Sequence, residues 1–512
     1  MDSLPVYWFS VLISGVLVLF SVLLWRKKTN MLPLPPGPPA WPVVGNLFLL
    51  GQKPNYSLFA LSRQYGPLMT IYLGMKRAVV VSTSAMAKEV LKTHDHNFAG
   101  RTLIQAMKVL SYHKSSLVWS QYGPYWRKLR RVLTTELLSP KKLQASQHVR
   151  RDSVFEMVRL IFEDNCAKGK SVSIGDTMIR TALNLMGNMI FSANVFDPSI
   201  PNGVELSNGL SSWVKLCQKP HLADLFPCLG FLDLHGVGGK IGVQLKRAHY
   251  CIDLSISNRL ESRRTELGNE GEAPKDFLDS LLELRDQGDQ DISLTQIRAI
   301  IFEQLVAGSD NTGATLEWAM AELIHNPHTM KKVQEELEQV VGRERRVEES
   351  DLDHLPYLRA VVKEVFRLHP VAPLLLPHRA DSSCEIMGFV IPKDTQIWVN
   401  VWAIGRDPAV WKEPSKFMPE RFLEGEKSKM DFKGQDFDLI PLGAGRRMCV
   451  GLPLADKMVH LILASLIHSF DWSLPDGIRV EEMDMDDVFS IVLKKRQGLQ
   501  AIPTPRLPHS LY

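Results

Sequence analysis

The pattern of apolar and polar residues divides the chain into segments with different predicted structures. An uncharged apolar run extends from Val6 to Trp25, and it is long enough for a membrane-spanning helix, which takes about 20 residues. From about Ser84 to Asn326, apolar residues recur with the period of an α-helix. After Pro370, short apolar runs bounded by turn residues predict strands, and a last long helix follows them.

Two further segments predict small β-structures. The segment GPLMTIYLGMKRAVVVSTS, residues 66–84, alternates apolar and turn residues, and DDVFSIVLKKRQGLQAIPTPR, residues 486–506, is typical of a hairpin. Neither an internal repeat nor a linker divides residues 44–512. We therefore expect one large α+β domain, mainly helical, over this range.

The charges around the N-terminal apolar run predict how it would lie in a membrane. Asp2 precedes the run, and Arg26, Lys27 and Lys28 follow it. A cleaved signal peptide has a basic start and a shorter apolar region of about 7–15 residues. Because basic flanks stay on the cytosolic side, we interpret residues 1–28 as a transmembrane anchor with a basic stop. The alternative is a buried core helix.

A proline-rich segment follows the predicted anchor. LPLPPGPPAWP, from Leu32 to Pro42, has six prolines in eleven residues, which excludes a helix and favours a stiff, extended spacer. Residues 29–43 are therefore predicted to be a hinge that holds the domain of residues 44–512 at a set angle to the membrane. The alternative, a flexible linker, would be richer in glycine and serine.

Composition and charge narrow the functional classes. The 512 residues are 45% hydrophobic and 23% charged, which is typical of a globular protein. A formal net charge of +4 is too small to indicate a nucleic-acid partner. None of the six cysteines belongs to a Cys-x-x-Cys pair, so neither a disulfide framework nor a structural zinc site is predicted.

One cysteine stands in an unusual segment, PLGAGRRMCVG, from Pro441 to Gly451. A thiolate is stabilised beside arginine and at the start of a helix, and both surround Cys449. The glycines would let the backbone turn tightly and approach a flat partner closely. From these residues alone, Cys449 is a nucleophile, a redox thiol or a metal ligand.

Several short motifs together resemble the cytochromes P-450. The pattern around Cys449 is similar to the haem-binding loop of that family, and further motifs follow the family's order: YWRKLRR with Trp126 and Arg130, KEVFRLHP with Glu364 and Arg367, FMPERF with Arg421, and Gly445-x-Arg447-x-Cys449-x-Gly451. The resemblance covers essentially the whole chain. LPPGPPAWPVVGN and EWAMAEL are similar to the plant microsomal branch, and the details are closest to its geraniol hydroxylases and iridoid oxidases.

The resemblance implies a cytochrome P-450 fold in which haem b lies between a distal and a proximal helix. Cys449 would be the axial ligand of the haem iron, to which a thiolate donates electron density. The side chains that would bind the haem and its propionates, which suit guanidinium groups, are Trp126, Arg130, His378, Arg379 and Arg447. For Trp126, packing is the alternative role. The family's buried ion-paired triad would consist of Glu364, Arg367 and Arg421.

The segment AGSDNT is similar to the family's oxygen-binding motif on the distal helix. Ala307 and Gly308 are small and would leave room above the haem, and Asp310 would help to deliver protons. The family usually has threonine where this chain has Asn311, and an amide relays protons less well than a hydroxyl. Three outcomes are open. Asn311 itself supports hydroxylation, or Thr312 takes its place if the helix is distorted there, or the enzyme tolerates weaker proton delivery because its reaction is unusual. Phenol coupling or rearrangement without oxygen insertion would be such a reaction.

The resemblance implies a monooxygenase of the endoplasmic reticulum membrane that hydroxylates a lipophilic terpenoid, alkaloid or phenolic. The chain lacks a nicotinamide- or flavin-binding motif, so electrons from NADPH would arrive through a separate NADPH–cytochrome P-450 reductase, with cytochrome b5 as a further donor. Arg446, Lys128 and Arg131 are candidates for the reductase-binding face, with solvated charges as the alternative. The segments expected to contact substrate are residues 102–120 and 210–225, Val371, Ala372, Leu374, Leu375 and Phe489 to Val492.

Other functions remain open on the sequence. A haem-binding sensor or carrier would use the same haem residues without turnover, and a cysteine hydrolase would explain Cys449 alone. The family usually has phenylalanine at the position of Leu442, beside the thiolate. We expect the smaller side chain to change the haem potential or haem retention modestly.

Overall fold

The computed structural model describes residues 32–196, 202–218, 221–229, 236–265, 275–289, 291–475 and 477–512. The predicted transmembrane anchor, residues 1–28, lies outside these residues. Over the described ranges, no helix combines the length and apolar character needed to cross a membrane.

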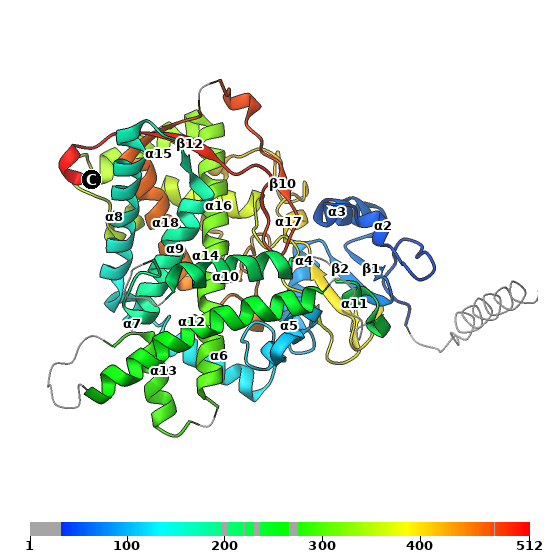
Figure 1. The fold of residues 1–512 in the computed structure, drawn as a ribbon. Coiled ribbons are helices and arrows are strands. Elements are labelled where there is room, and N and C mark those ends of the chain that lie inside the picture. Colours follow the sequence, from blue (N-terminus) through cyan, green and yellow to red (C-terminus); the bar gives the residue numbers. More distant parts are fainter. Residues whose placement is uncertain are drawn as a thin grey trace, which may run out of the picture.

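Helices dominate the structure and surround the long helix α14 (Leu294–His325), as Figure 1 shows. The other α-helices of the described residues are α2 (Leu47–Leu50), α3 (Pro54–Tyr65), α4 (Ser84–Lys88), α5 (Gln105–Lys108), α6 (Pro124–Glu136), α7 (Pro140–Ala145), α8 (Gln147–Asp164), α9 (Ile174–Phe191), α10 (Gly203–Cys217), α11 (Leu222–Leu225), α12 (Val237–Thr265), α13 (Phe277–Asp286), α15 (Pro327–Val340), α16 (Pro356–Leu368), α17 (Val401–Ile404) and α18 (Leu452–Ser469). Most of α14 is buried, which its largely apolar sequence explains.

Helix α9 packs closely against α14 because glycines on α14 leave space for it. A Cβ atom on Gly313 would lie 2.4 Å from Cγ1 of Ile179 and 3.0 Å from its backbone nitrogen. A Cβ atom on Gly308 would lie 2.8 Å from the Met186 side chain, also on α9. Both positions therefore exclude a larger residue as long as the helices keep this separation.

The strands form several small sheets at different sides of the helical body (Figure 1). The largest has the order β1-β2-β8-β5-β3, built from β1 (Leu68–Leu73), β2 (Lys76–Val81), β8 (Gln396–Val399), β5 (His378–Arg379) and β3 (Gly100–Arg101). The pair β6 (Cys384–Ile386) and β7 (Phe389–Ile391), the pair β10 (Asp487–Val488) and β11 (Lys494–Lys495), and the sheet β4 (Val172–Ser173), β12 (Gln500–Pro505) and β9 (Phe470–Ser473) complete the β-structure. These strands confirm the β-structure predicted at residues 66–84, after Pro370 and at the C-terminus.

The described part of the proline segment is bound to the domain. The carbonyl of Pro36 accepts a hydrogen bond from the Thr70 amide at 2.8 Å, and Pro33 accepts one from Val390 at 3.0 Å. Gly37 is so close to β1 that a Cβ atom there would lie 1.9 Å from the Thr70 oxygen. The described part of the segment is therefore packed against the domain, because its proline carbonyls are acceptors that neighbouring amides use.

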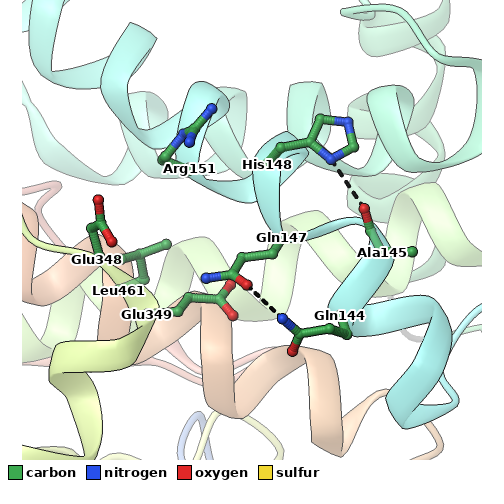
Figure 2. Close-up of a pocket in the computed structure, with 8 residues that line it drawn as sticks. All are labelled: Gln144, Ala145, Gln147, His148, Arg151, Glu348, Glu349 and Leu461. Carbon is green, nitrogen blue, oxygen red and sulfur yellow. Dashed lines mark hydrogen bonds between the residues drawn. The ribbon is translucent and has the colours of Figure 1, made fainter.

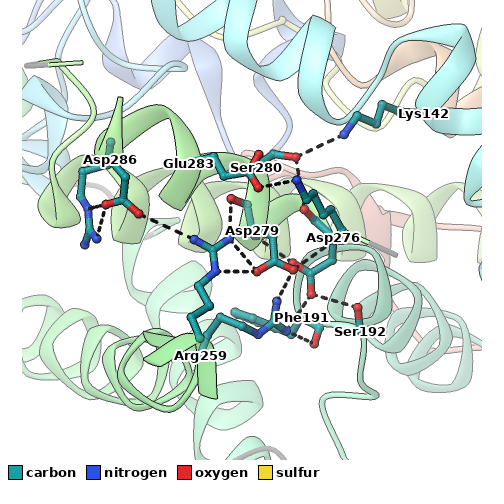
Figure 3. A network of polar contacts seen from close by, with 12 residues as sticks. Lys142, Phe191, Ser192, Arg259, Asp276, Asp279, Ser280, Glu283 and Asp286 are labelled. Atoms are coloured by element: carbon teal, nitrogen blue, oxygen red, sulfur yellow. Dashed lines mark hydrogen bonds and ion pairs between the residues drawn. The ribbon is translucent and has the colours of Figure 1, made fainter. Parts of the chain in front are cut away.

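Polar contacts join α12 to α13 away from the core. Arg259 on α12 binds Asp276 at 2.8 Å and Asp279 at 2.7 Å, and Arg263 binds Asp279 at 2.9 Å (Figure 3). Asp276 also caps α13, with its carboxylate accepting the Asp279 amide. One aspartate thus holds the start of α13 and its connection to α12.

Candidate active site

The loop before α18 is shaped by glycine. Gly443 and Gly445 have φ values of 72° and 67°, in the left-handed region that favours glycine. A Cβ atom on Gly445 would lie 1.8 Å from the Leu91 carbonyl oxygen. The Cys449 amide donates to the Leu442 carbonyl at 3.0 Å, and α18 begins three residues beyond Cys449. The loop therefore places the thiol at the start of a helix.

The thiol of Cys449 lies at the wall of a cavity of about 360 Å³. Burial raises the pKa of Cys449, whereas the Gly451 and Leu452 amides and the Arg130 guanidinium act to lower it. The amides and the guanidinium all favour the thiolate over the thiol. A cation at the thiolate would complete the same effect, so this environment suits a metal ligand.

The rest of the cavity wall is mostly apolar. Helix α14 contributes Val306 and Ala307 to this wall, and α10 contributes Trp213. Segments predicted to contact substrate also line it, through Met107, Leu117, Val118, Trp119, Val214, Cys217, Val371, Ala372, Leu375, Ile491 and Val492. The predicted substrate segments thus meet at one cavity, although Leu374 and Phe489 are not among the lining residues.

Three arginines at the cavity bind only carbonyl groups. Arg130 donates to the Met448 carbonyl at 2.9 Å, and Arg447 donates to the carbonyls of Ala99 at 2.8 Å and Ser120 at 2.7 Å. Arg101 donates to the carbonyls of Leu376 at 2.8 Å and Val118 at 3.3 Å. In the described part of the chain, none of the three forms an ion pair with a carboxylate.

Burial lowers the pKa values of the three guanidinium groups. Burial, with the Arg447 charge, lowers the pKa of Arg101 to about 9. Burial also lowers the pKa of Arg447, to about 10, and that of Arg130. Buried cations without acidic partners are costly, so the site is built for an anionic group. Arg101 belongs to no motif, and its pairing with His378 between β3 and β5 is visible only in the fold.

The remaining predicted haem residues lie in different places. The Trp126 indole donates to the Leu117 carbonyl at 3.0 Å, and its ring contacts the Arg447 guanidinium at 4.7 Å from the ring centroid. His378 lines the cavity with Nδ1 2.8 Å from the Phe98 carbonyl, and burial lowers its pKa to about 3. Adjacent strand residues face opposite ways, so Arg379 points away from the cavity.

Arg379 instead binds Asp381 at 2.8 Å and is not among the cavity-lining residues. The structure therefore separates it from the other residues that the resemblance assigned to the haem. Sequence reasoning could not distinguish His378 from Arg379, because which of two neighbouring residues faces the cavity depends on the pairing of the strand.

The structure brings Glu364, Arg367 and Arg421 together. Arg367 binds both carboxylate oxygens of Glu364 at 2.7 Å, and both side chains are fully buried. Arg421 binds Glu364 at 3.0 Å. Arg367 also donates to the carbonyls of Gly405 at 2.6 Å and Pro414 at 2.7 Å. The triad thus connects α16 to the segments that follow α17.

On the distal helix, Asn311 uses its amide to bond to the carbonyl of Ala307 at 3.1 Å, one turn earlier. Asn311 and Thr312 both line the cavity. Helix α14 continues through them without interruption, so the distortion expected to bring Thr312 into the place of Asn311 is absent from this described helix. Gly308 is also at the cavity, but its Cβ direction is occupied by Met186. Its small size therefore serves the contact with α9.

Asp310 connects the cavity to the surface. Its Oδ1 forms an ion pair with Lys494, whose side chain is 34% exposed, and its Oδ2 is buried with no hydrogen-bond partner among the described residues. Among the predicted reductase-binding cations, Lys128 binds Asp289 and Asp291, and Arg446 binds Asp95 at 3.1 Å. Arg131 is exposed.

A second cavity, of about 350 Å³, is lined by side chains of α7, α8, α18 and the 3₁₀ turn Glu349–His354 (Figure 2). It shares no residue with the cavity at Cys449. Its lining is mostly polar and includes His148, Arg151, Glu348 and Glu349. It offers neither the thiol nor the apolar wall of the first cavity.

The thiol, the arginines and the distal helix have the arrangement of a haem-thiolate enzyme, and the sequence comparison agrees. The Cytochrome P-450 family model matches residues 35–500. The chain belongs to this family and is a cytochrome P-450 monooxygenase.

Named relatives span nearly the full length. Geraniol 8-hydroxylase of Catharanthus roseus is 41% identical over 95% of this chain and 96% of its own. Iridoid oxidase of the same plant is 38% identical over 96% of both chains. A solved zebrafish cytochrome P-450 structure with progesterone has a TM-score of 0.73 at 29% identity, covering 88% of this chain and 99% of that one.

Family membership implies haem b, and the cavity residues fit it. A thiol in the cavity wall, together with small and apolar lining residues, suits a flat porphyrin with a sulfur-ligated iron. Arg101, Arg130 and Arg447 lack acidic partners among the described residues. Their guanidinium groups are therefore available to pair with the two haem propionates. When bound, the haem supplies the activation of dioxygen, with electrons from a redox partner. The protein supplies the ligand, the charges and the shape of the site.

Proposed function

We propose that this chain is anchored in the endoplasmic reticulum membrane and hydroxylates a small lipophilic plant metabolite, with terpenoids as the first class to test. The apolar cavity beside Cys449 carries this proposal, because an apolar wall with few polar groups selects a lipophilic ligand. The relatives named for geraniol and iridoids support the terpenoid class. Electrons would come from NADPH through a separate reductase, with cytochrome b5 as a further donor.

In this proposal the polar groups of α14 manage protons. Lys494 reaches solvent and binds Oδ1 of Asp310, whose Oδ2 is free to accept a proton on the buried side. Asn311 uses one N–H on the Ala307 carbonyl, which leaves its second N–H and its carbonyl oxygen for a water or an oxygen ligand. The apolar walls hold substrate on the side of α14 and exclude other water.

Co-expression with a reductase in microsomes would test this function. Terpenoid, alkaloid and phenolic substrates are supplied with NADPH, and products are identified by mass. We expect the gain of one oxygen atom on a terpenoid. A loss of two hydrogen atoms without oxygen gain would instead establish the coupling or rearrangement reaction that Asn311 suggests. Dependence on the added reductase tests the electron source separately.

The variant Asn311→Thr tests whether the amide limits proton delivery. Proton transfer by a positioned group contributes about 10²–10⁴-fold to a rate, so a threonine that restored a missing relay would raise coupled hydroxylation by roughly 100-fold. Because Asn311 already holds its place on the helix, we expect a change below about tenfold. Product yield is measured against hydrogen peroxide release, with Thr312→Val as the matched variant.

A further inference from the structure

Glu303 is a buried carboxylate of α14 with no role in the chemistry described so far. It lies one turn before Ala307, lines the cavity and is 6% exposed. Its oxygens accept hydrogen bonds from the Ser116 hydroxyl and from the amides of Leu117 at 2.8 Å and Val118 at 3.1 Å. Several donors of one short loop, residues 116–120, therefore converge on a single carboxylate.

The other side of loop 116–120 holds the haem-facing side chains. The Leu117 carbonyl accepts a hydrogen bond from the Trp126 indole at 3.0 Å. The Ser120 carbonyl accepts one from Arg447 at 2.7 Å, and the Val118 carbonyl accepts one from Arg101 at 3.3 Å. Amide donors thus face the Glu303 anion, and carbonyl acceptors face two buried cations. Peptide groups arranged in this way are favourably oriented in both fields, which strengthens each hydrogen bond in a low-dielectric interior.

Glu303 has little remaining capacity to bind a ligand itself. Oε1 accepts from Ser116 and Val118, and Oε2 accepts from Leu117. The Tyr112 side chain is a further hydrogen-bond partner. A carboxylate offers about four lone-pair sites, so these contacts nearly fill them. The carboxylate is therefore better suited to hold the loop than to bind substrate.

We propose that Glu303 is a positioning residue that couples the distal helix to the haem-binding arginines. Its carboxylate fixes loop 116–120 by the amide side, so that the carbonyl side holds Arg101, Trp126 and Arg447 at the haem. The same loop presents Leu117 and Val118 to the cavity, so Glu303 also fixes where substrate is held. Only this last part rests on the proposed function.

The variant Glu303→Gln tests the coupling. The substitution removes the negative charge and points an NH₂ donor at loop groups that are themselves donors. In the full chain with haem bound, hydrogen–deuterium exchange at Leu117 and Val118 is expected to accelerate at least about tenfold, as the loss of a hydrogen bond to a charged group predicts. Haem transfer to apomyoglobin is expected to accelerate as well. Neither measurement requires a substrate.

Glu317→Gln is the matched control on the same helix, since Glu317 is buried and accepts the Leu499 amide at 2.9 Å. It should change exchange near Leu499 and leave loop 116–120 and haem transfer unaltered. Glu303→Asp keeps the charge and should restore slow exchange partly. With a substrate in hand, Glu303→Gln should broaden the distribution of oxidised positions more than it lowers total turnover.

Unchanged exchange at Leu117 and Val118 in Glu303→Gln would overturn the proposal. It would also be overturned if exchange rose equally throughout the protein, because that result describes general destabilisation. Faster loop exchange with unchanged haem transfer would refute the coupling to the arginines. Failure to find any oxidised product would refute the proposed function and leave these substrate-free results standing.

Discussion

Gly308 and Gly445 each have a packing constraint in addition to the role that the sequence predicts for them. The sequence suggested that Gly308 leaves room above the haem, but its Cβ direction is filled by Met186 of α9. Gly445 was expected to let the loop approach a flat partner. Its φ of 67° and its closeness to the Leu91 carbonyl show that it also meets a neighbouring chain segment. Such neighbours are distant in sequence, so local patterns do not contain them.

The variant Gly445→Ala should therefore damage the haem loop. A strained left-handed conformation costs about 1–3 kcal/mol, and the Cβ atom would also lie 1.8 Å from the Leu91 oxygen. We expect a lower fraction of haem-loaded protein and a lower thermal midpoint. Gly123→Ala is the control, because the backbone at Gly123 is extended and no atom of the described residues lies within 4 Å of the added Cβ atom. Equal effects of both variants would contradict this explanation.

At the scale of elements, periodicity predicted the helical body and the small β-structures, because each element's buried face repeats along its own sequence. The proline segment shows the limit of this approach. Its composition predicts an extended chain, which the described part adopts, but the hydrogen bonds to Thr70 and Val390 depend on strands far along the chain. An extended segment can be a hinge between two bodies, or it can pack along a sheet. Only the residues that it contacts in the fold distinguish these two cases.

An ion-paired cluster between elements gives a pH-dependent prediction. Glu349 binds the fully buried Arg150 of α8 at 3.0 Å and Lys457 of α18 at 3.1 Å. Burial alone would raise the pKa of Glu349, but Arg150 and Lys457 hold it below its usual value. The folded state thus binds this proton less readily than the unfolded state. The stabilisation is complete above the unfolded pKa of about 4.3 and is lost as the pH falls through the folded value.

We expect Glu349→Gln to lower the free energy of unfolding by about 3–5 kcal/mol at neutral pH, because it leaves Arg150 buried without its anion. The difference from wild type should shrink as the pH falls below about 4.3. Urea unfolding followed by tryptophan fluorescence measures both. Glu344→Gln, an exposed position for which the described residues show no ion pair, should run parallel to wild type. A difference for Glu349→Gln that stays constant with pH would refute the assignment.

At the scale of the whole molecule, the haem site is assembled from distant parts of the chain. Motifs located Cys449, Arg447 and Arg130, because their spacing within one loop or one helix is local. Arg101 could not be found in this way: it reaches the cavity because β3 pairs with β5, some 280 residues later in the numbering. The same pairing turns His378 toward the cavity and Arg379 away from it. Residues brought together by tertiary pairing therefore escape motif reasoning, and their roles have to be taken from the fold.

This difference leads to a direct comparison of two arginines. Arg101 is buried at the cavity without an acidic partner in the described chain, whereas Arg379 is ion-paired to Asp381 at 2.8 Å. If Arg101 helps to neutralise the haem propionates, Arg101→Gln should accelerate haem loss about tenfold to 100-fold, the effect of one hydrogen bond between charged groups. Arg379→Gln should change haem loss by less than about fivefold, because exposed pairs contribute about 1 kcal/mol or less. Both rates are measured by haem transfer to apomyoglobin, and Arg101→Lys, which retains the charge without the planar fork, should lie between wild type and Arg101→Gln.

Faster haem loss from Arg379→Gln than from Arg101→Gln would reverse the assignment and restore the role that the sequence motif first gave to Arg379.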